Sequence, residues 1–461
     1  MQRIIALTWL TWKAAFRFRL FLVIAGLLLA SVVVLPLVIQ DDGTARGFTQ
    51  ILLTYTLSVI TGLLGLSTLW LACGTLARDI EECQMQMVAT KPVARWQIWL
   101  GKWFGIISLN AALLALSGAG VYGLLQWRAT KLPVAEQAVL RQQVLVARGS
   151  AREKDFNAEI DAATERVLQD RLKNSPVNKA DLAEVRRQIY ELVKADFQLV
   201  PPGYSRQWQI DLGFAKNFLK DKPLQLRVKF NSAQGSATGT FIGLWQVGVP
   251  GTARFWRSEP MSLAPNTFHE FQIPPNLYDD KGVLTIVFVN PTDTSLLFPL
   301  EDGMAVLYPE GGFALNFARG LGIIFCWLAL LAALGLAAAS FLTFPVAAFV
   351  SLAILVIGLS GRTLAEAVSA GTIAGGNSET GVMGHSVADA VVIPLFKGFL
   401  KVIGMVEDFS PINSLSSGRC ISWSELGLAF GQIVLLPGGL IGFIGIFLFN
   451  RRELATAQGT Q

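Results

Sequence analysis

The chain has 461 residues, of which 52% are hydrophobic and 15% charged, with a mean hydropathy of +0.48 and a formal net charge of +5. These values exclude an ordinary soluble domain and predict a polytopic membrane protein. The basic residues stand in short segments that flank apolar runs. The positive net charge therefore indicates membrane topology and gives no reason to expect nucleic-acid binding.

Five runs are apolar over the roughly 20 residues that a helix needs to cross a bilayer core of about 30 Å. They lie near 20–39, 50–76, 103–125, 317–342 and 426–449. A sixth run, near 344–360, is shorter, and we expect six spans in all. Residues 1–19 alternate apolar and basic positions, which predicts an amphipathic helix in the membrane interface ahead of the first span.

Basic residues of the short flanks predict the orientation of the spans. They precede the first span, lie between the second and third, and follow the last: Arg3, Lys13, Arg17, Arg19, Arg78, Lys91, Arg95, Lys102, Arg451 and Arg452. With six spans, the positive-inside rule puts both termini in the cytoplasm of a cell whose inner (cytoplasmic) membrane holds the chain. The long insert between the third and fourth spans then lies outside.

A polar interval from Arg78 to Trp103 separates the second and third apolar runs, and we expect a coupling helix over 79–97 within it. Its acidic start suits a helix N-terminus, where negative charge is favourable. Methionines in its middle offer an adaptable apolar surface, and Lys91-Pro92 ends the helix. An interfacial helix without a partner is the plainer interpretation. The candidate coupling residues are Arg78, Asp79, Glu81, Glu82, Met85, Lys91, Pro92, Arg95, Gly101 and Lys102.

The first part of the insert, 127–200, has apolar residues at helical spacing. Ser150 with Glu153 three residues later predicts the capping box of a helix start. We expect an α-helical hairpin, or three helical pieces, that forms an extracytoplasmic stalk on the third span. A plain charged stalk without a further role is the simpler interpretation, because mixed charge on a helix face usually serves solvation.

The second part of the insert, 201–312, changes to a hydrophobic period of two after Pro201 and Pro202. Asp302-Gly303 predicts a turn between two strands. We expect a β-sandwich of about seven or eight strands, jelly-roll-like in its order. Trp245, Phe255 and Trp256 are candidate ligand-binding residues if their rings are exposed to stack on a sugar. Aromatic residues at strand spacing are more often core residues, and that interpretation is favoured.

The last part of the chain, 313–461, carries spans four to six, as 1–126 carries the first three. Gly311 and Gly312 permit an elbow, after which Phe313, Leu315 and Phe317 are expected in the outer interface. Within 361–424 a Gly/Ser-rich loop precedes an apolar run over 387–406. We expect an in-plane or re-entrant helix on the outer side, because a further crossing would place Arg451 and Arg452 outside.

The sequence offers little material for chemistry of its own. The apolar cores of the predicted spans contain no Asp, Glu, Lys, Arg or His, which argues against an ion-driven transporter and an intramembrane enzyme. Only two histidines and four scattered cysteines are present, so we expect neither a metal site nor a disulfide framework. A G-x-x-x-x-G-K-[ST] loop is also missing, so any ATP must bind to another polypeptide.

The polar interval resembles the coupling region of permease subunits from the second superfamily of ABC exporters. There, acidic residues, an apolar helix, a Pro-Val with Arg two residues later, and a Gly-Lys stand between the second and third spans. The corresponding residues here are Asp79, Glu81, Glu82, Pro92, Val93, Arg95, Gly101 and Lys102. The ending from Phe449 to Ala455 and the spacing of six spans are also similar. Cys83-Gln84 departs from the Gly-Thr of many members, and the insert has hardly any part in the resemblance.

The resemblance implies a permease that is not itself an enzyme. It would dimerise with an identical or different second copy and receive a separate ABC ATPase, which holds the ATP and magnesium. The uncharged spans suit export of a hydrophobic or lipid-linked substrate, glycans included. A second hypothesis is an ATP-driven mechanical transducer, in which the insert acts on an envelope partner and nothing crosses the bilayer.

Overall fold

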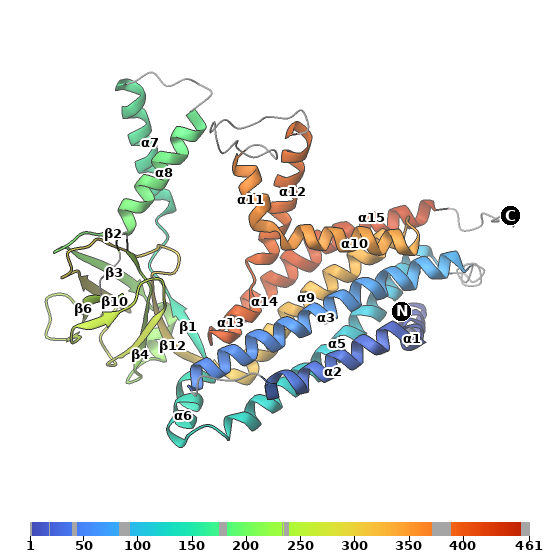
Figure 1. The fold of residues 1–461 in the computed structure, drawn as a ribbon, viewed down its shortest axis with the longest axis horizontal. Helices are drawn as coiled ribbons and strands as arrows, with labels where there is room; N and C mark the ends of the chain where they lie inside the picture. The colour runs from blue at the N-terminus through green and yellow to red at the C-terminus, as the bar shows by residue number, and fades with distance from the viewer. Residues whose placement is uncertain are drawn as a thin grey trace. The chain divides into compact units, whose positions relative to one another are not determined.

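The computed structural model describes residues 2–17, 19–38, 44–82, 93–174, 182–232, 234, 239–370 and 389–452. The chain divides into two compact units. The membrane unit comprises 1–147 and 312–461 and is almost entirely helical, whereas the insert unit comprises 148–311 and contains the β-sheets (Figure 1). The insert unit therefore begins at residue 148, and its helices and strands belong to one compact unit.

Five helical segments of the described chain are long and apolar enough to cross a membrane. They belong to α2 (Arg19–Val38), α3 (Ala45–Glu81), α5 (Arg95–Ala129), α9 (Phe313–Ala339) and a continuous stretch from α14 (Trp423–Ala429) through η3 (Phe430–Gly438) to α15 (Gly439–Arg451). This confirms a multi-pass membrane protein. The sixth apolar helix, α10 (Phe344–Leu359), has 16 residues. At 1.5 Å per residue it is about 24 Å long, shorter than a bilayer core.

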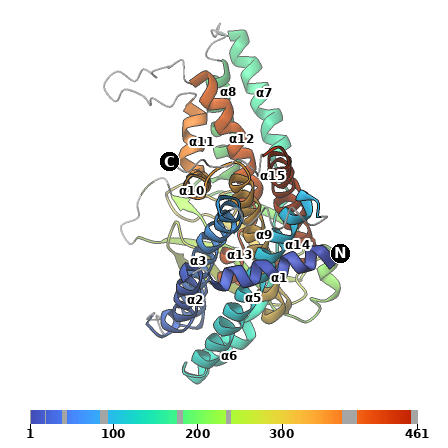
Figure 2. The same cartoon turned by 90° about the vertical axis from the view of Figure 1, so that its right-hand side faces the viewer.

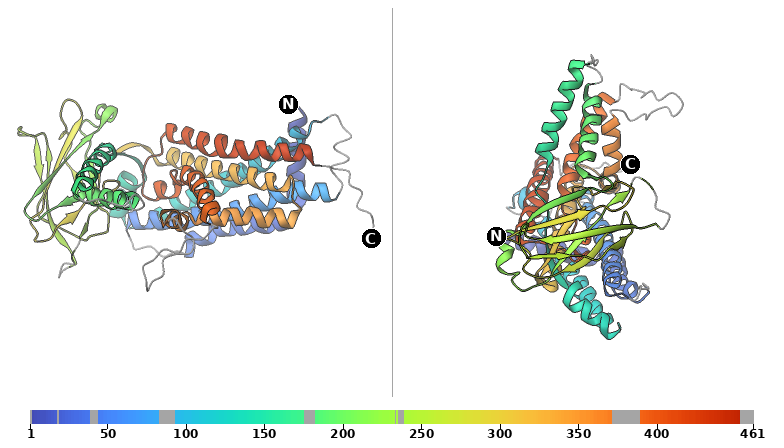
Figure 3. Two further views of the ribbon diagram at one scale, coloured as in Figure 1. Left: turned by 90° about the horizontal axis from the view of Figure 1, so that it is seen from above. Right: turned by 90° about the vertical axis from the view of Figure 1, so that its left-hand side faces the viewer.

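The long helices lie side by side (Figure 3, left). Close contacts between small residues hold them together. Gly335 of α9 faces Ala72 of α3 so closely that a Cβ added at Gly335 would lie 2.7 Å from the Ala72 Cβ. Asn110 of α5, 1% exposed, donates to the Thr68 hydroxyl of α3 at 2.8 Å. Small residues and buried polar pairs are the usual means by which helices associate where lipid offers no hydrophobic driving force.

Two further helices follow α10 in the membrane unit. α11 (Gly361–Ala370) and α12 (Asp389–Glu407) pack against each other, and their axes run crosswise to α9 and α10 (Figure 1). The helix expected over 387–406 is present as α12, and its in-plane or re-entrant course stays a prediction. The predicted loop over 371–384 lies outside the described residues. A short helix, α13 (Pro411–Ser416), then leads to α14.

The insert unit contains two main antiparallel sheets. Their strand orders are β1-β12-β4-β9 and β3-β10-β6-β7, with β8 paired to β6 (Figure 3, right). The strands are β1 (Val146–Ala151), β3 (Ser205–Asp211), β4 (Leu224–Val228), β6 (Phe241–Gly248), β7 (Phe255–Arg257), β8 (Met261–Leu263), β9 (His269–Ile273), β10 (Val283–Val289) and β12 (Met304–Gly312). Three short strands, β2 (Leu199–Val200), β5 (Asn231–Ser232) and β11 (Leu296–Leu297), form a separate small sheet. The strand order of the two main sheets agrees with the predicted jelly roll.

The core of the insert unit lies between the two main sheets. It is built from inward-facing residues of both, such as Leu226 of β4 and Ile286 of β10. Trp208, Trp245 and Phe288 are among its largest fully buried side chains. The predicted period of two produces this core because alternate residues of a strand face opposite sides of the sheet. Trp245 is 1% exposed, which confirms the favoured interpretation of this residue as core and excludes the alternative of an exposed ligand-binding ring.

The predicted helical hairpin is present but starts later than expected. Ser150 lies in β1 and Glu153 pairs with Ile210 of β3, so neither residue opens a helix. Strand pairing prevails over the local capping pattern, because it satisfies more backbone N–H and C=O groups. α7 begins at Asn157, next to the Asp155 carboxylate, and runs to Asn174.

The hairpin is anchored to the β-sandwich of its own unit. α8 (Leu182–Gln198) packs on α7 through Ile160, Leu168, Ile189 and Val193. At the base of α8, Lys194 forms an ion pair with Glu301 at 2.6 Å. The hairpin and the sandwich therefore belong together.

The return to the membrane needs no loop. β12 ends at Gly312 and α9 begins at Phe313. Phe313 and Phe317 are 4% exposed and lie beside the ring of Tyr122 on α5, with ring centroids 6.3 and 6.1 Å away. Helix packing therefore buries these two rings, whereas Leu315 is exposed.

The predicted turn at Asp302-Gly303 gives a test of the sandwich. Gly303 donates its backbone N–H to the Pro299 carbonyl, and an added Cβ would lie 2.4 Å from that carbonyl oxygen. We expect Gly303→Ala to lower the free energy of unfolding of the insert unit by about 1–3 kcal/mol, measured by denaturant unfolding. Gly311→Ala is the control, because no atom lies within 4 Å of its added Cβ. Equal stability of the two variants would contradict this packing.

Candidate functional site

Five helix ends meet at one end of the membrane unit, the end from which the polar interval departs (Figure 1). They are the C-terminal ends of α3, α9 and α15 and the N-terminal ends of α5 and α10. Five charged side chains join them, and we call this set the cap cluster: Asp79, Glu81, Arg95, Lys102 and Arg452. Each helix end leaves four backbone N–H or C=O groups without an intrahelical partner. Charged side chains gather here because they bind these groups.

Lys102 and Asp79 connect α5 to α3. The Lys102 ammonium is buried, with the residue 7% exposed, and lies 2.5 Å from Asp79 Oδ2. It also donates to the Thr75 carbonyl at 2.7 Å. A buried ammonium is tolerated only when it is paired and hydrogen-bonded, and both conditions are met. The pair thus fixes the two helices that enclose the polar interval.

Arg95, the first residue of α5, caps the last turn of α15. Its Nη1 donates to the carbonyls of Phe449, Asn450 and Arg452 at 3.1, 2.9 and 2.8 Å. A cation at this place satisfies carbonyl groups that the helix leaves unpaired and suits the negative end of its dipole. The start of α5 and the end of α15 are therefore held together.

Arg452 and Glu81 extend the cap cluster to α9 and α10. Arg452 donates to the carbonyls of Ala339 and Leu342 at 3.1 and 3.4 Å, at the end of α9. Burial lowers the pKa of Arg452, and the Glu81 carboxylate opposes that shift. Glu81 Oε1 accepts the backbone N–H of Phe344, the first residue of α10, at 2.8 Å. The Arg78 guanidinium lies 4.4 Å from the centroid of the Phe344 ring.

The acidic residues of the interval end a helix instead of opening one. α3 runs without a break through Arg78 and Asp79 to Glu81, and Glu82 follows as its C-cap. The expected start of a separate coupling helix at residue 79 is therefore wrong. Negative charge here does cap a helix N-terminus, but that helix is α10, which follows more than 250 residues later. Met85, Lys91 and Pro92 lie outside the described residues.

Gly101 supports a contact that the sequence did not reveal. α1 (Gln2–Arg17) crosses α5 (Figure 2), with Leu7 over Gly101 and Thr11 over Gly105. A Cβ added at either glycine would lie 2.5 Å from the Cβ of the residue above it. The Trp12 indole also donates to the Ser108 hydroxyl at 2.9 Å. Gly101 thus contacts α1, and the next residue, Lys102, binds α3.

Other residues at this end were missed because their partners are distant in sequence. Trp99 is 2% exposed and packs on α15, where Gly442 and Gly445 make room for its ring. Thr75 acts through its carbonyl oxygen, which any residue would supply. The sequence indicated Arg452 only as part of the C-terminal segment from Phe449 to Ala455, which resembles the ending of the family.

The candidate sugar-binding residues do not form a joint site. Trp245 lies in the core between the sheets, and Trp256 is half-buried with its ring 6.2 Å from that of Phe271. Phe255 is 55% exposed. Among the described residues no group of three or more His, Cys, Asp or Glu side chains could hold a metal ion.

Comparisons with known proteins add no relative. A scan against protein-family models, a search of curated proteins and a search of solved structures each find no match to this chain.

Removal of one partner of the buried ion pair tests its role. Lys102→Met leaves the Asp79 carboxylate, 30% exposed, without its ammonium. We expect the free energy of unfolding to fall by roughly 2–4 kcal/mol. The double variant Lys102→Met/Asp79→Asn should lose less, because it removes the stranded charge as well. Lys173→Met, which breaks an exposed pair with Asp170, should change stability by less than about 1 kcal/mol. Additive losses at residues 79 and 102 would contradict the coupling.

The glycine contact under α1 gives a second test. Gly105→Ala should separate α1 from α5, because neither Cβ atom can move without backbone displacement. Backbone amides of residues 2–17 should then exchange with deuterated solvent faster than in the wild type. Gly123→Ala on the same helix, where the added Cβ meets no atom within 4 Å, is the matched control. Unchanged exchange in α1 would show that the glycines are dispensable.

Proposed function

We propose that this chain is the permease subunit of an ABC exporter, driven by a separate ATPase on its cytoplasmic face. The observation that carries the proposal is the cap cluster. The flanks of the polar interval are hydrogen-bonded to other helix ends and to each other: Glu81 to the start of α10, Arg95 to the end of α15, and Lys102 of α5 to α3. A force applied to the interval would therefore reach four of the proposed spans directly.

The same arrangement indicates where the ATPase docks. The charges of the cap cluster are used inside the chain, and their reversal would break the packing of the membrane unit. Within the interval, the sequence offers Met85, Met87 and Val88 as apolar contact residues, and these lie outside the described part of the chain. Methionine-rich surfaces adapt to a partner. We therefore assign docking to 83–92 and transmission of movement to the charged flanks.

The full assembly follows from the proposal. α10 is the short sixth span, both termini lie in the cytoplasm, and the insert unit lies outside the inner membrane. A second permease copy, identical or different, completes the transport path. ATP and magnesium bind to the ATPase. The substrate is hydrophobic or lipid-linked, glycans included, because the middle portions of the described spans carry no ionised side chain to bind a charged one.

Co-purification tests the proposal. The tagged full chain, purified from its native membrane, should retain an ABC ATPase that mass spectrometry identifies. Met85→Asp/Val88→Asp should abolish this retention, while the unfolding midpoint of the chain stays unchanged. Leu192→Asp, which places the same charge at an exposed site of α8, should retain the ATPase. A chain that purifies without any nucleotide-binding partner, or a double variant that keeps it, would refute the proposal.

A mechanical transducer is the second candidate, favoured by one observation. The insert forms its own compact unit of 148–311, and β12 continues into α9 with no intervening loop residue. Movement of α9 would reach the sandwich directly. ATP-dependent uptake of lipid-linked substrates by reconstituted vesicles would favour the exporter; ATP hydrolysis without movement of any substrate would favour the transducer.

A further inference from the structure

A crevice lies between α2 and α3 near the cap-cluster end of the membrane unit. Its walls are mostly apolar and come from both helices: Phe21, Ile24, Ser67, Trp70, Leu71 and Gly74. From Gly74 to the end of α3 at Glu81 the helix rises about 10 Å, so the crevice is close to the helix ends. Trp70 is 41% exposed, so the crevice opens on the outer surface of the helix bundle. With its open side included, it encloses about 250 Å³, room for several methylene groups of one acyl chain.

Aromatic rings connect the two walls of the crevice to α1 and to α10. On the α2 wall, the Phe21 ring meets the Phe16 ring of α1 edge-on, with the centroids 6.0 Å apart. On the α3 wall, the Trp70 ring meets the Phe344 ring of α10 edge-on at 5.1 Å. Edge-to-face pairs add to the stability that burial alone provides. Both walls are therefore supported by neighbouring helices, and a ligand enters a crevice that is already formed.

The exposed face of α1 next to this crevice is basic and aromatic. Trp9, Lys13 and Arg17 follow one another at four-residue spacing, so they lie on one face of the helix, and all three are exposed. Arg17 adjoins Phe16, whose ring contacts the crevice wall. α1 contains no acidic residue, and no carboxylate of the described chain forms an ion pair with Lys13 or Arg17. Basic residues beside an exposed tryptophan on an amphipathic helix are typical of contact with anionic lipid.

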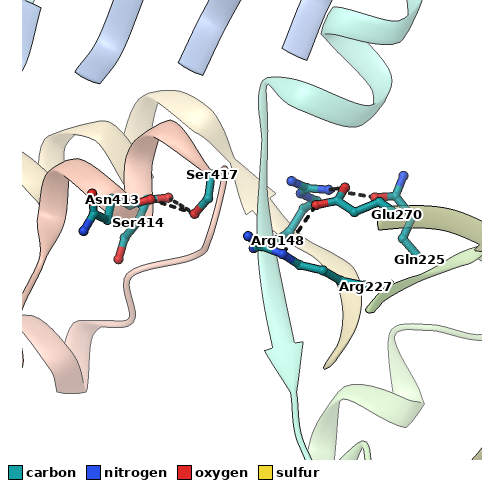
Figure 4. A network of polar contacts seen from close by, with 7 residues as sticks. All are labelled: Arg148, Gln225, Arg227, Glu270, Asn413, Ser414 and Ser417. Carbon is teal, nitrogen blue, oxygen red and sulfur yellow. Dashed lines mark hydrogen bonds and ion pairs between the residues drawn. The ribbon is translucent and has the colours of Figure 1, made fainter. Parts of the chain in front are cut away.

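Clustered basic residues of the insert unit are used differently. Arg148 donates to Glu270 and Gln225 at 2.7 and 2.8 Å, and Arg227 forms an ion pair with the same Glu270 at 3.9 Å (Figure 4). These guanidinium groups therefore have carboxylate and amide partners within their own unit. The charges on the exposed face of α1 have none in the described chain and are left for water or for a ligand.

We propose that the crevice and the basic face of α1 together bind one anionic phospholipid. Part of one acyl chain fills the crevice between Phe21 and Trp70, and the phosphate binds Lys13 and Arg17. A phospholipid fits both parts, because it joins an apolar chain to an anionic head. Free phosphate fits only the basic face, and an uncharged lipid fits only the crevice. This site goes beyond the proposed function and does not depend on it, because lipid binding needs neither nucleotide nor an ATPase.

Native mass spectrometry of the delipidated full chain tests this inference. Dioleoyl phosphatidylglycerol should bind at least roughly tenfold more tightly than dioleoyl phosphatidylcholine, which has the same chains and no net charge. Lys13→Gln/Arg17→Gln should weaken phosphatidylglycerol binding by about fivefold for each basic residue removed, hence about 25-fold, and leave phosphatidylcholine binding unchanged. The matched control is Lys131→Gln/Arg141→Gln, which removes the same charge from two exposed residues outside the crevice and should bind both lipids as the wild type does.

A bulky side chain in the crevice gives the second arm. Ile24→Trp should weaken the binding of both lipids, whereas Leu27→Trp, at a 54% exposed position of the same helix, should not. Equal affinity for the two lipids would overturn the inference, as would an equal loss in the control pair of variants. Displacement of phosphatidylglycerol by an equal concentration of soluble glycerol phosphate would also overturn it, because the crevice would then contribute nothing. A dimer that binds no lipid would contradict it as well, since a second copy of the chain would then cover the crevice.

Discussion

Helix ends in an apolar environment set the constraint on which the membrane unit depends. Each end leaves backbone N–H or C=O groups without partners, and within a bilayer no water replaces them at depth. In this chain, charged side chains from neighbouring helices supply the partners: Arg95 for α15, Arg452 for α9 and Glu81 for α10. A buried hydrogen bond to a charged group contributes roughly 1.5–3 kcal/mol, and the exposed contacts of Arg95 with Asn450 and of Glu81 contribute less because solvent screens them. The caps therefore also define which helices are neighbours.

The opposite end of the membrane unit follows the same rule. The Glu136 carboxylate accepts the backbone N–H of Ala45 at the start of α3 at 2.8 Å, and Arg128 donates to the Pro36 carbonyl near the end of α2. Arg319 of α9 donates to the Ile421 carbonyl at 2.7 Å, ahead of α14. These charged side chains of the membrane unit thus bind groups at helix ends, and the span interiors rely on small residues and neutral hydrogen bonds. If the helices move and one of these caps breaks, the backbone groups that lose their partner need another hydrogen-bond partner.

Sequence patterns predicted the elements better than their connections. Apolar length identified the five long membrane helices, and the hydrophobic period of two identified the sandwich, because both signals are local. Two interpretations failed where a distant partner decided the outcome: Ser150 and Glu153 joined a sheet, and Asp79 and Glu81 ended α3. Trp245 is a core residue, as the favoured interpretation of the strand-spaced aromatics predicted. Of the candidate site, composition correctly indicated that Arg95, Lys102 and the acidic residues matter, but their partners lie up to about 350 residues away and leave no local trace.

Hydrogen–deuterium exchange of the full chain in nanodiscs tests most directly whether Arg95 holds the helix ends together. If the account is correct, Arg95→Gln accelerates exchange in the last turn of α15, residues 446–452, and also at the end of α9, residues 337–342, because loss of one cap displaces Arg452. The sandwich strands should exchange as in the wild type. Faster exchange confined to residues 93–98 would contradict the account, because the guanidinium would then stabilise only its own helix.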